Sequence, residues 1–219
     1  MLLRTITFVG CLIALAVSGV SAQIHDKEGD SYLELGWARF DIDGEFDDSL
    51  LLSTSTQMVN VPEVLEAEGM HFAFGNAWNQ GGVSFFYFTA NPKTRSVLGD
   101  QDGRLHLYGM DAYGLPFAKK TKSPLINPLV RCGVSLISLG IDDSATDGNS
   151  LADATFRGVA GMLGIGVLLQ LGQTGHIVAE VDRRWMTFAT VTGTDDAIDL
   201  EDNISLKTDF VKVSFSFYL

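Results

Sequence analysis

The chain contains few cysteines and, beyond its N-terminal segment, no long apolar run. Cys11 and Cys132 are the only two cysteines in 219 residues, and Cys11 lies in a segment that we expect to be removed. The remaining chain would then hold a single thiol, which excludes an internal disulfide bond. No second run of about 20 residues lacks both charges and turn signals, so the sequence predicts no transmembrane helix.

Basic residues are scarce as well, 15 against 27 acidic residues, and the formal net charge is −12. A chain this acidic is a poor candidate for general nucleic-acid binding, which needs a basic surface. The four histidines show no metal-ligand spacing with cysteine or with one another. No Gly-x-Ser-x-Gly elbow is present, and the glycines between 158 and 166 have no P-loop lysine. The sequence therefore predicts no catalytic residue, no cofactor and no metal centre.

Residues 1–22 have the pattern of an export signal. Arg4 supplies a positive charge, Ile6 to Val17 form an apolar region too short to span a bilayer, and Val20-Ser21-Ala22 offers a small-residue cleavage site. An uncleaved anchor is the alternative. We expect a signal peptide at 1–22 and a single domain over 23–219, since all-β barrels often run to about 200–250 residues undivided.

Short segments rich in Val, Phe, Tyr, Leu and Gly alternate with turn-forming clusters in the rest of the chain, and no helical pattern dominates. Eight segments are predicted as strands: 31–41, 69–79, 83–91, 103–113, 129–140, 155–171, 176–190 and 204–219. The fold class is therefore all-β.

The sixth and the last segments alternate most clearly, with one face fit for hydrocarbon. A helix is the rival structure for the sixth, but its four glycines would each cost a soluble helix about 1 kcal/mol. The other face of the sixth segment is small, as a crowded barrel lumen requires. The predicted lipid-facing residues are Val159, Leu163, Ile165, Val167 and Leu169 in the sixth segment, and Val211, Val213, Phe215, Phe217 and Leu219 in the last.

The alternation changes phase in two segments. Leu105 and Leu107 lead onto Asp111, and Ile204 and Leu206 change face near Phe210-Val211. A β-bulge in each strand would reset the phase; the alternative is that the predicted registers are wrong.

The links between strands alternate in length. Asn79–Gly82 and Gly172–Gly175 are tight hairpins, whereas 42–68 and 191–203 are long and 92–102 and 141–154 are of middle length. By this alternation the link 114–128 should be short, and it is the only link that departs from the pattern. Together with Asp41, the long links and 141–154 carry 17 of the 27 acidic residues. An up-and-down meander with an acidic long-link end is therefore predicted.

Charged residues are predicted to line the interior of the barrel, and aromatic residues are predicted to lie at the two membrane interfaces. In the seventh segment Glu180, Asp182 and Arg184 share one face, which must meet a polar interior or water. With Glu34 they are candidates for an ion network that fills the lumen. Further candidates, unless they lie at the rims, are Arg39, Arg104, Arg131 and Arg157. Candidates for aromatic residues at the two membrane interfaces are Trp37, Trp78, Trp185 and Tyr218, although a soluble sandwich core would also use them.

At this point the chain resembles the small outer-membrane β-barrel proteins of Gram-negative bacteria, a group that includes the OmpA membrane domain, OmpX and the opacity-type proteins. The resemblance covers about residues 31–219. It rests on the signal pattern, the eight segments, the link asymmetry, the Gly-rich run Leu163–Val167 before Ala179–Arg184, and the last segment. Leu219 departs from the family, whose last residue is usually Phe. The resemblance implies a closed antiparallel up-and-down transmembrane barrel of eight strands.

The implied function is structural or surface-interactive, with a plugged lumen and no catalysis. The implied partners are outer-membrane lipids including lipopolysaccharide, divalent cations at the acidic loops, and ligands on other cells or a host. Three alternatives stay open: a narrow pore for small solutes, a lipid-modifying enzyme that uses His71 or His106, and a soluble lipocalin-like barrel. The lipocalin-like barrel would be apolar inside and polar outside.

Overall fold

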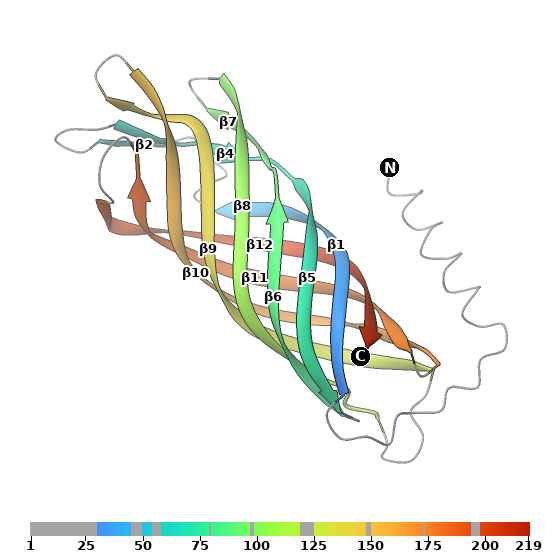
Figure 1. Cartoon of the computed structure of the whole chain (residues 1–219). Coiled ribbons are helices and arrows are strands. Elements are labelled where there is room, and N and C mark those ends of the chain that lie inside the picture. Colours follow the sequence, from blue (N-terminus) through green and yellow to red (C-terminus); the bar gives the residue numbers. More distant parts are fainter. Residues whose placement is uncertain are drawn as a thin grey trace.

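The computed structural model describes a barrel of antiparallel strands (Figure 1). The described residues are 30–44, 50–53, 58–78, 80–96, 99–118, 125–147, 150–172, 174–193 and 198–219. The predicted signal segment 1–22 lies outside them and stays a prediction. No helix within these ranges is long and apolar enough to cross a membrane.

Eight long strands form the wall, and four short strands lie in the links. The wall strands are β1 (Asp30–Gly44), β5 (Ala67–Trp78), β6 (Gly81–Ala90), β8 (Gly99–Gly114), β9 (Ile126–Asp147), β10 (Ser150–Leu171), β11 (Gly175–Thr192) and β12 (Ile198–Tyr218). The short strands are β2 (Leu50–Ser53), β3 (Met58–Val61), β4 (Glu63–Val64) and β7 (Lys93–Ser96). All eight predicted strands are confirmed.

The wall closes on itself. The strand order β9-β10-β11-β12-β1-β5-β6-β8 is completed by pairing of β8 with β9, so each wall strand has two hydrogen-bonded neighbours. The stagger of the closed sheet is found by following paired residues around the barrel from Trp37 of β1. In one direction, through β5, β6 and β8, the partner reached on β9 is Ser138. In the other direction, through β12, β11 and β10, the partner reached on β9 is Pro128. These two residues of β9 are ten apart, which is the stagger of a strongly tilted eight-stranded barrel.

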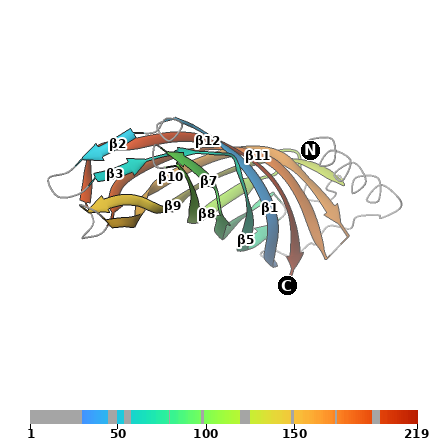
Figure 2. The same cartoon turned by 90° about the horizontal axis from the view of Figure 1, so that it is seen from above.

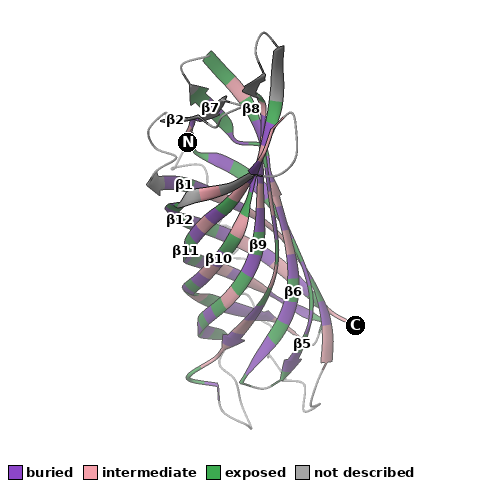
Figure 3. Ribbon diagram, turned by 90° about the vertical axis from the view of Figure 1, so that its left-hand side faces the viewer, coloured by how far each residue is buried: buried purple, intermediate pink, exposed green. Residues whose placement is uncertain are grey.

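Exposed and buried residues alternate along the wall strands (Figure 3). In the half nearest the tight hairpins the outward residues are apolar and form what we call the apolar belt. Its members include Leu33, Leu35, Met70, Phe72, Phe74, Val83, Phe85, Tyr108, Met110, Val130, Val134, Leu136, Val159, Leu163, Ile165, Val181, Val211 and Phe217. A belt of this kind fits hydrocarbon rather than water.

Beyond the belt, toward the long links, the apolar face lies inside. The outward residues here are polar, and the inward ones form a packed hydrophobic cluster; we call this half of the barrel the collar. Outward polar residues of the collar are Arg39, Asp41, Glu68, Arg157, Lys207 and Asp209. Its core includes Phe40, Phe88, Leu105, Leu107, Leu139, Phe156, Phe188, Leu206 and Phe210. The expected small or polar interior therefore holds for part of the belt half only. At the hairpin end of that half, inward side chains form a second apolar cluster of Tyr32, Ala77, Tyr113, Leu129, Leu168 and Val178.

This exchange of faces explains the two phase changes in the sequence. Leu105, Leu107 and Asp111 all point inward on β8, and its register with β6 and β9 runs unbroken across them. Leu206 and Phe210 also point inward on β12, while Val211 points outward. No bulge is needed, because the strand stays regular and only its apolar side changes. Register shifts occur elsewhere, between Arg157 and Gly158 among other places.

The strands run into the regions predicted as links. β9 and β10 continue to Asp147 and from Ser150, so the predicted link 141–154 is largely strand. The segment 92–102 forms the β7–β8 hairpin. Seen from above, β2 and β3 lie beside the end of β9 (Figure 2). Val61 and Val64 are buried in the collar core, so the first long link closes over its interior.

Candidate functional site

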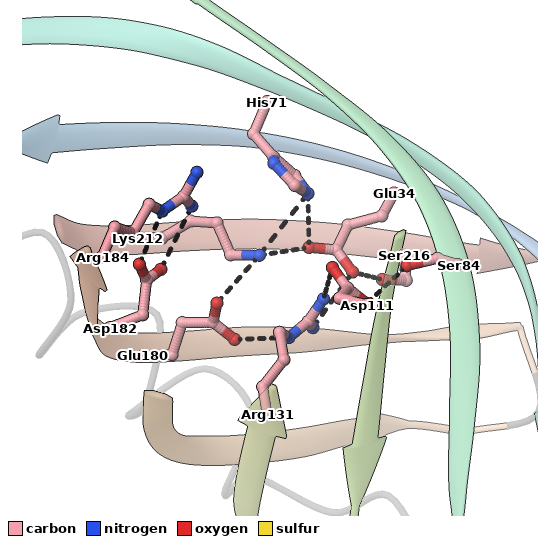
Figure 4. Close-up of polar contacts among 10 residues, drawn as sticks. All are labelled: Glu34, His71, Ser84, Asp111, Arg131, Glu180, Asp182, Arg184, Lys212 and Ser216. Atoms are coloured by element: carbon pink, nitrogen blue, oxygen red, sulfur yellow. Dashed lines mark hydrogen bonds and ion pairs between the residues drawn. The ribbon is translucent and has the colours of Figure 1, made fainter. Parts of the chain in front are cut away.

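The belt half encloses an ion network that crosses the lumen (Figure 4). Arg131 of β9 and Glu34 of β1 belong to strands on opposite sides of the barrel and are joined by Nη2–Oε2 at 3.5 Å. Arg131 Nε lies 3.0 Å from Glu180 Oε2, and Lys212 Nζ lies 3.0 Å from both Glu34 Oε1 and Glu180 Oε1. Arg131, Glu34, Lys212 and Glu180 thus form a closed ring of ion pairs, which we call the ion ring.

Neighbouring strands extend the ion ring. Arg131 also donates to Asp111 at 3.1 Å, and Asp111 accepts a second hydrogen bond from Ser84 at 2.7 Å. His71 Nε2 lies 3.4 Å from Glu34 Oε1, and Ser216 donates to Glu34 Oε2 at 3.4 Å. All these side chains are buried.

A second, separate buried ion pair lies next to the collar core. Arg184 donates to Asp182, two residues earlier on β11, at 2.7 and 3.3 Å. The Arg184 guanidinium carbon also lies 3.9 Å from the centre of the Phe210 ring, with Phe86 and Phe88 at 5.6 and 5.9 Å. A guanidinium can stack on aromatic faces while its edge binds a carboxylate. Arg184 therefore lies where the polar layer meets the apolar layer.

Glycines on β10 make room for the carboxylates. Gly164 pairs directly with Asp182, and Gly166 pairs with Glu180. A Cβ atom on Gly164 would lie 2.8 Å from Asp182 Cβ, and one on Gly166 would lie 2.6 Å from Glu180 Cβ. Because real Cβ atoms do not approach this closely, the small face of the sixth predicted strand serves to seat the acids of the seventh.

The four predicted interior residues all point into the lumen: Glu34 and Glu180 belong to the ion ring, and Asp182 and Arg184 form the separate ion pair. Of the four further arginines, only Arg131 joins the ion ring. Arg39 pairs with Glu66 and Arg104 with Asp142 on the outer surface, and Arg157 is exposed. These three arginines are rim residues, which was the alternative.

The sequence analysis missed Lys212, Asp111, His71, Ser84 and Ser216 as members of the network. A signal for two of them was present. Lys212 and Ser216 alternate with outward Val211, Val213, Phe215 and Phe217, so period two alone places them inside.

Nine of the ten residues predicted to face lipid lie on the outer surface. Val159, Leu163, Ile165, Val167, Val211, Phe217 and Leu219 are exposed, and Val213 and Phe215 are half-buried. Leu169 is a correction, because only 7% of it is exposed. It lies between Ile126 and Ile177 in register, where the chain entering β9 bonds to β10 through Gln170 N and Leu125 O (3.0 Å).

The predicted interface aromatics lie toward the edges of the apolar belt. Trp78 and Tyr218 end β5 and β12 beside the tight hairpins. Trp37 is the last apolar outward residue of β1 before Arg39, and Trp185 follows Arg183 on the outside of β11. Whether they meet lipid headgroups stays a prediction.

The two histidines considered for catalysis lie on opposite faces of the wall. His71 points inward to Glu34, whereas His106 contacts the outward Tyr87. Ser84 donates to Asp111 rather than to a histidine. Within the described ranges, no group of three or more His, Cys, Asp or Glu residues could hold a metal ion. The charges of the network are buried and paired with one another inside the lumen, as buried charges must be.

Comparison with known proteins supports the fold. No protein-family model and no curated protein matches the chain. Neisserial surface protein A is 10% identical, with a TM-score of 0.57 over 86% of this chain and 97% of that one. Ail, the attachment invasion locus protein of Yersinia pestis, is 10% identical, with a TM-score of 0.46 over 87% of this chain and 100% of that one. The outer membrane protease OmpT from Escherichia coli is 8% identical, with a TM-score of 0.39 over 91% of this chain and 99% of that one.

The fold is therefore that of the small outer-membrane β-barrels, as the resemblance implied: a closed antiparallel barrel of eight wall strands. At such low identity the likeness extends to the fold and no further.

Proposed function

We propose that this chain is a plugged barrel of the outer membrane with a structural or surface-interaction role and no catalytic step. One observation carries the proposal: side chains fill the lumen in three successive layers, the first of which is the second apolar cluster at the hairpin end. The ion ring crosses the belt half, and the collar core fills the half beyond it. An eight-stranded barrel is narrow enough for side chains to fill it.

The two halves of the outer surface support a membrane position. The apolar belt would lie in hydrocarbon, in contact with outer-membrane lipids including lipopolysaccharide, after export directed by residues 1–22. The collar would then project from the bilayer and carry the acidic long links. Ligands on other cells or a host, and divalent cations, are the partners proposed for those links.

Conductance across a planar lipid bilayer tests the plug. The protein should show no unitary current steps. Arg131→Ala, which opens the ion ring, should also stay silent because the collar core still closes the lumen. Heat-modifiable migration in gels confirms that each sample is a folded barrel. Discrete channels in the unmodified protein would overturn the plug and favour a narrow pore for small solutes.

A further inference from the structure

Stacked aromatic rings cross the outer wall over β5, β6 and β8. Phe72, Tyr87 and Tyr108 are direct neighbours in register and point outward. Their ring centres lie 6.4 Å apart for the first pair and 4.9 Å for the second, with interplanar angles of 20° and 28°. His106 is stacked on Tyr87 at 6.0 Å and 11°.

Hydrogen bonds orient the imidazole of His106. The hydroxyls of Tyr87 and Thr89 lie 2.9 and 3.2 Å from His106 Nδ1. Two hydroxyls converging on Nδ1 favour the tautomer that carries its proton on Nε2. The outer surface thus presents an N–H donor fixed beside aromatic rings, and no acceptor for it appears among the described residues.

This group lies where the apolar belt ends. On the outside of β8 the residues run from Met110 and Tyr108 to His106 and Arg104, so apolar side chains give way to polar ones here. Arg104 is 63% exposed on its side chain and pairs with Asp142 at 3.1 Å. An ion pair this exposed is weak and can exchange partners.

The exposed charges at the edge of the belt differ between β6 and β8 on one side and β1 and β5 on the other. At the corresponding edge of the belt, Asp41 of β1, Glu68 of β5 and Glu66 just before β5 are exposed around a single arginine, Arg39. In a chain of net charge −12, an anionic lipid would be repelled there. At the edge over β6 and β8, by contrast, the surface acids Asp102 and Asp142 are each paired with a base, Lys93 and Arg104, so the two signs of charge balance.

We propose that Tyr87, Tyr108, His106 and Arg104 form a binding site for the sugar-phosphate headgroup of an outer-leaflet glycolipid. The aromatic rings offer π faces to the C–H groups of a sugar ring, and His106 Nε2–H and the Arg104 guanidinium donate to a phosphate. The proposal rests on the membrane position given above, but it does not depend on the plug.

Lipid binding to the folded protein in detergent micelles tests the site. Native mass spectrometry would measure retention of lipid A, a diphosphorylated acyl-glucosamine disaccharide, against phosphatidylglycerol, which is anionic but lacks the sugar. Tyr108→Leu and His106→Leu should each weaken lipid A binding by about fivefold, since aromatic and hydrogen-bond contacts of this kind contribute on the order of 1 kcal/mol. Trp185→Leu is the matched control, because Trp185 is an exposed aromatic on β11 outside the stack.

The site is supported if lipid A binds more tightly than phosphatidylglycerol, and if only the β8 variants lose that preference while remaining heat-modifiable barrels. Unchanged lipid A binding in both β8 variants would overturn it. If phosphatidylglycerol binds as tightly as lipid A, and the two β8 variants lose both lipids equally, the assignment to a glycolipid is overturned. Conductance of the same samples reports on the plug separately, so the two proposals can fail independently.

Discussion

At the scale of single residues, Arg131 contacts more carboxylates than any other basic side chain described in the lumen. It contacts the carboxylates of Glu34, Asp111 and Glu180 with almost no exposure to water. Lys212 contacts two of the three as well, so the ion ring shares its charges among several strands. Burying these charges costs desolvation free energy when the barrel folds. Removing one partner costs more, because it leaves a buried charge uncompensated.

Arg131→Met should therefore lower the free energy of unfolding by about 3–5 kcal/mol. Urea unfolding in detergent micelles, followed by tryptophan fluorescence, measures the change. Arg104→Met is the control: its ion pair is exposed, and its loss should cost at most about 1 kcal/mol. Equal effects of the two substitutions would show that the ion ring does not stabilise the barrel.

The glycines of β10 give a second prediction at this scale. Gly166→Ala places a methyl group against Glu180 and should destabilise the barrel by about 1–3 kcal/mol through overpacking. Gly161 is on the same strand, but a Cβ there would meet nothing within 4 Å. Gly161→Ala should thus be neutral or stabilising in the same unfolding experiment. If Gly161→Ala lowers the free energy of unfolding more than Gly166→Ala does, Glu180 does not need the space left by the absent side chain of Gly166.

At the scale of elements, each long strand serves two environments. The residues of β12 from Val211 to Phe217 place apolar side chains outside, whereas Ile204, Leu206 and Phe210 place them inside. The strand needs no bulge between the two, because polar and apolar residues simply exchange sides. This is the pattern of a membrane barrel continued by a barrel of soluble type.

Phe210→Ala tests the apolar filling of the collar. Phe210 is fully buried and stacks on Phe40 at 5.0 Å, so its truncation should cost about 3–5 kcal/mol. Val211→Ala, at the adjacent outward position, should cost far less, because detergent or lipid replaces the lost contact. Chemical unfolding of both variants in micelles measures the difference. Comparable losses would mean that the collar interior is loosely filled.

The eight wall strands were predictable because alternation and tight hairpins are local signals. Their full length was not, since in the collar the apolar side faces inward and the outward side is polar, as at Arg157, Lys207 and Asp209. The membership of Glu34, Glu180, Asp182 and Arg184 in a polar interior followed from charges on one face of a strand. Which charges meet, as when Arg131 reaches Glu34 across the lumen, depends on the tilt and register of all eight strands.

At the scale of the whole molecule, the ion ring of the belt half lies between two apolar clusters, the one at the hairpin end and the collar core. The first long link adds Val61 and Val64 to the collar core, so its own side chains close the outer end. These filled layers support the proposed plug rather than the alternative of a narrow pore.

The most direct test of this account is the accessibility of labels along β12 in lipid vesicles. After Cys132→Ser, single cysteines at positions 213, 211, 207, 205 and 206 would carry a spin label and be exposed to oxygen, which partitions into lipid, and to a water-soluble nickel complex. We predict oxygen access at 213 and 211, nickel access at 207 and 205, and protection from both at 206. Oxygen access at 205 and 207, or nickel access at 206, would contradict the exchange of faces on which the two-halved barrel rests.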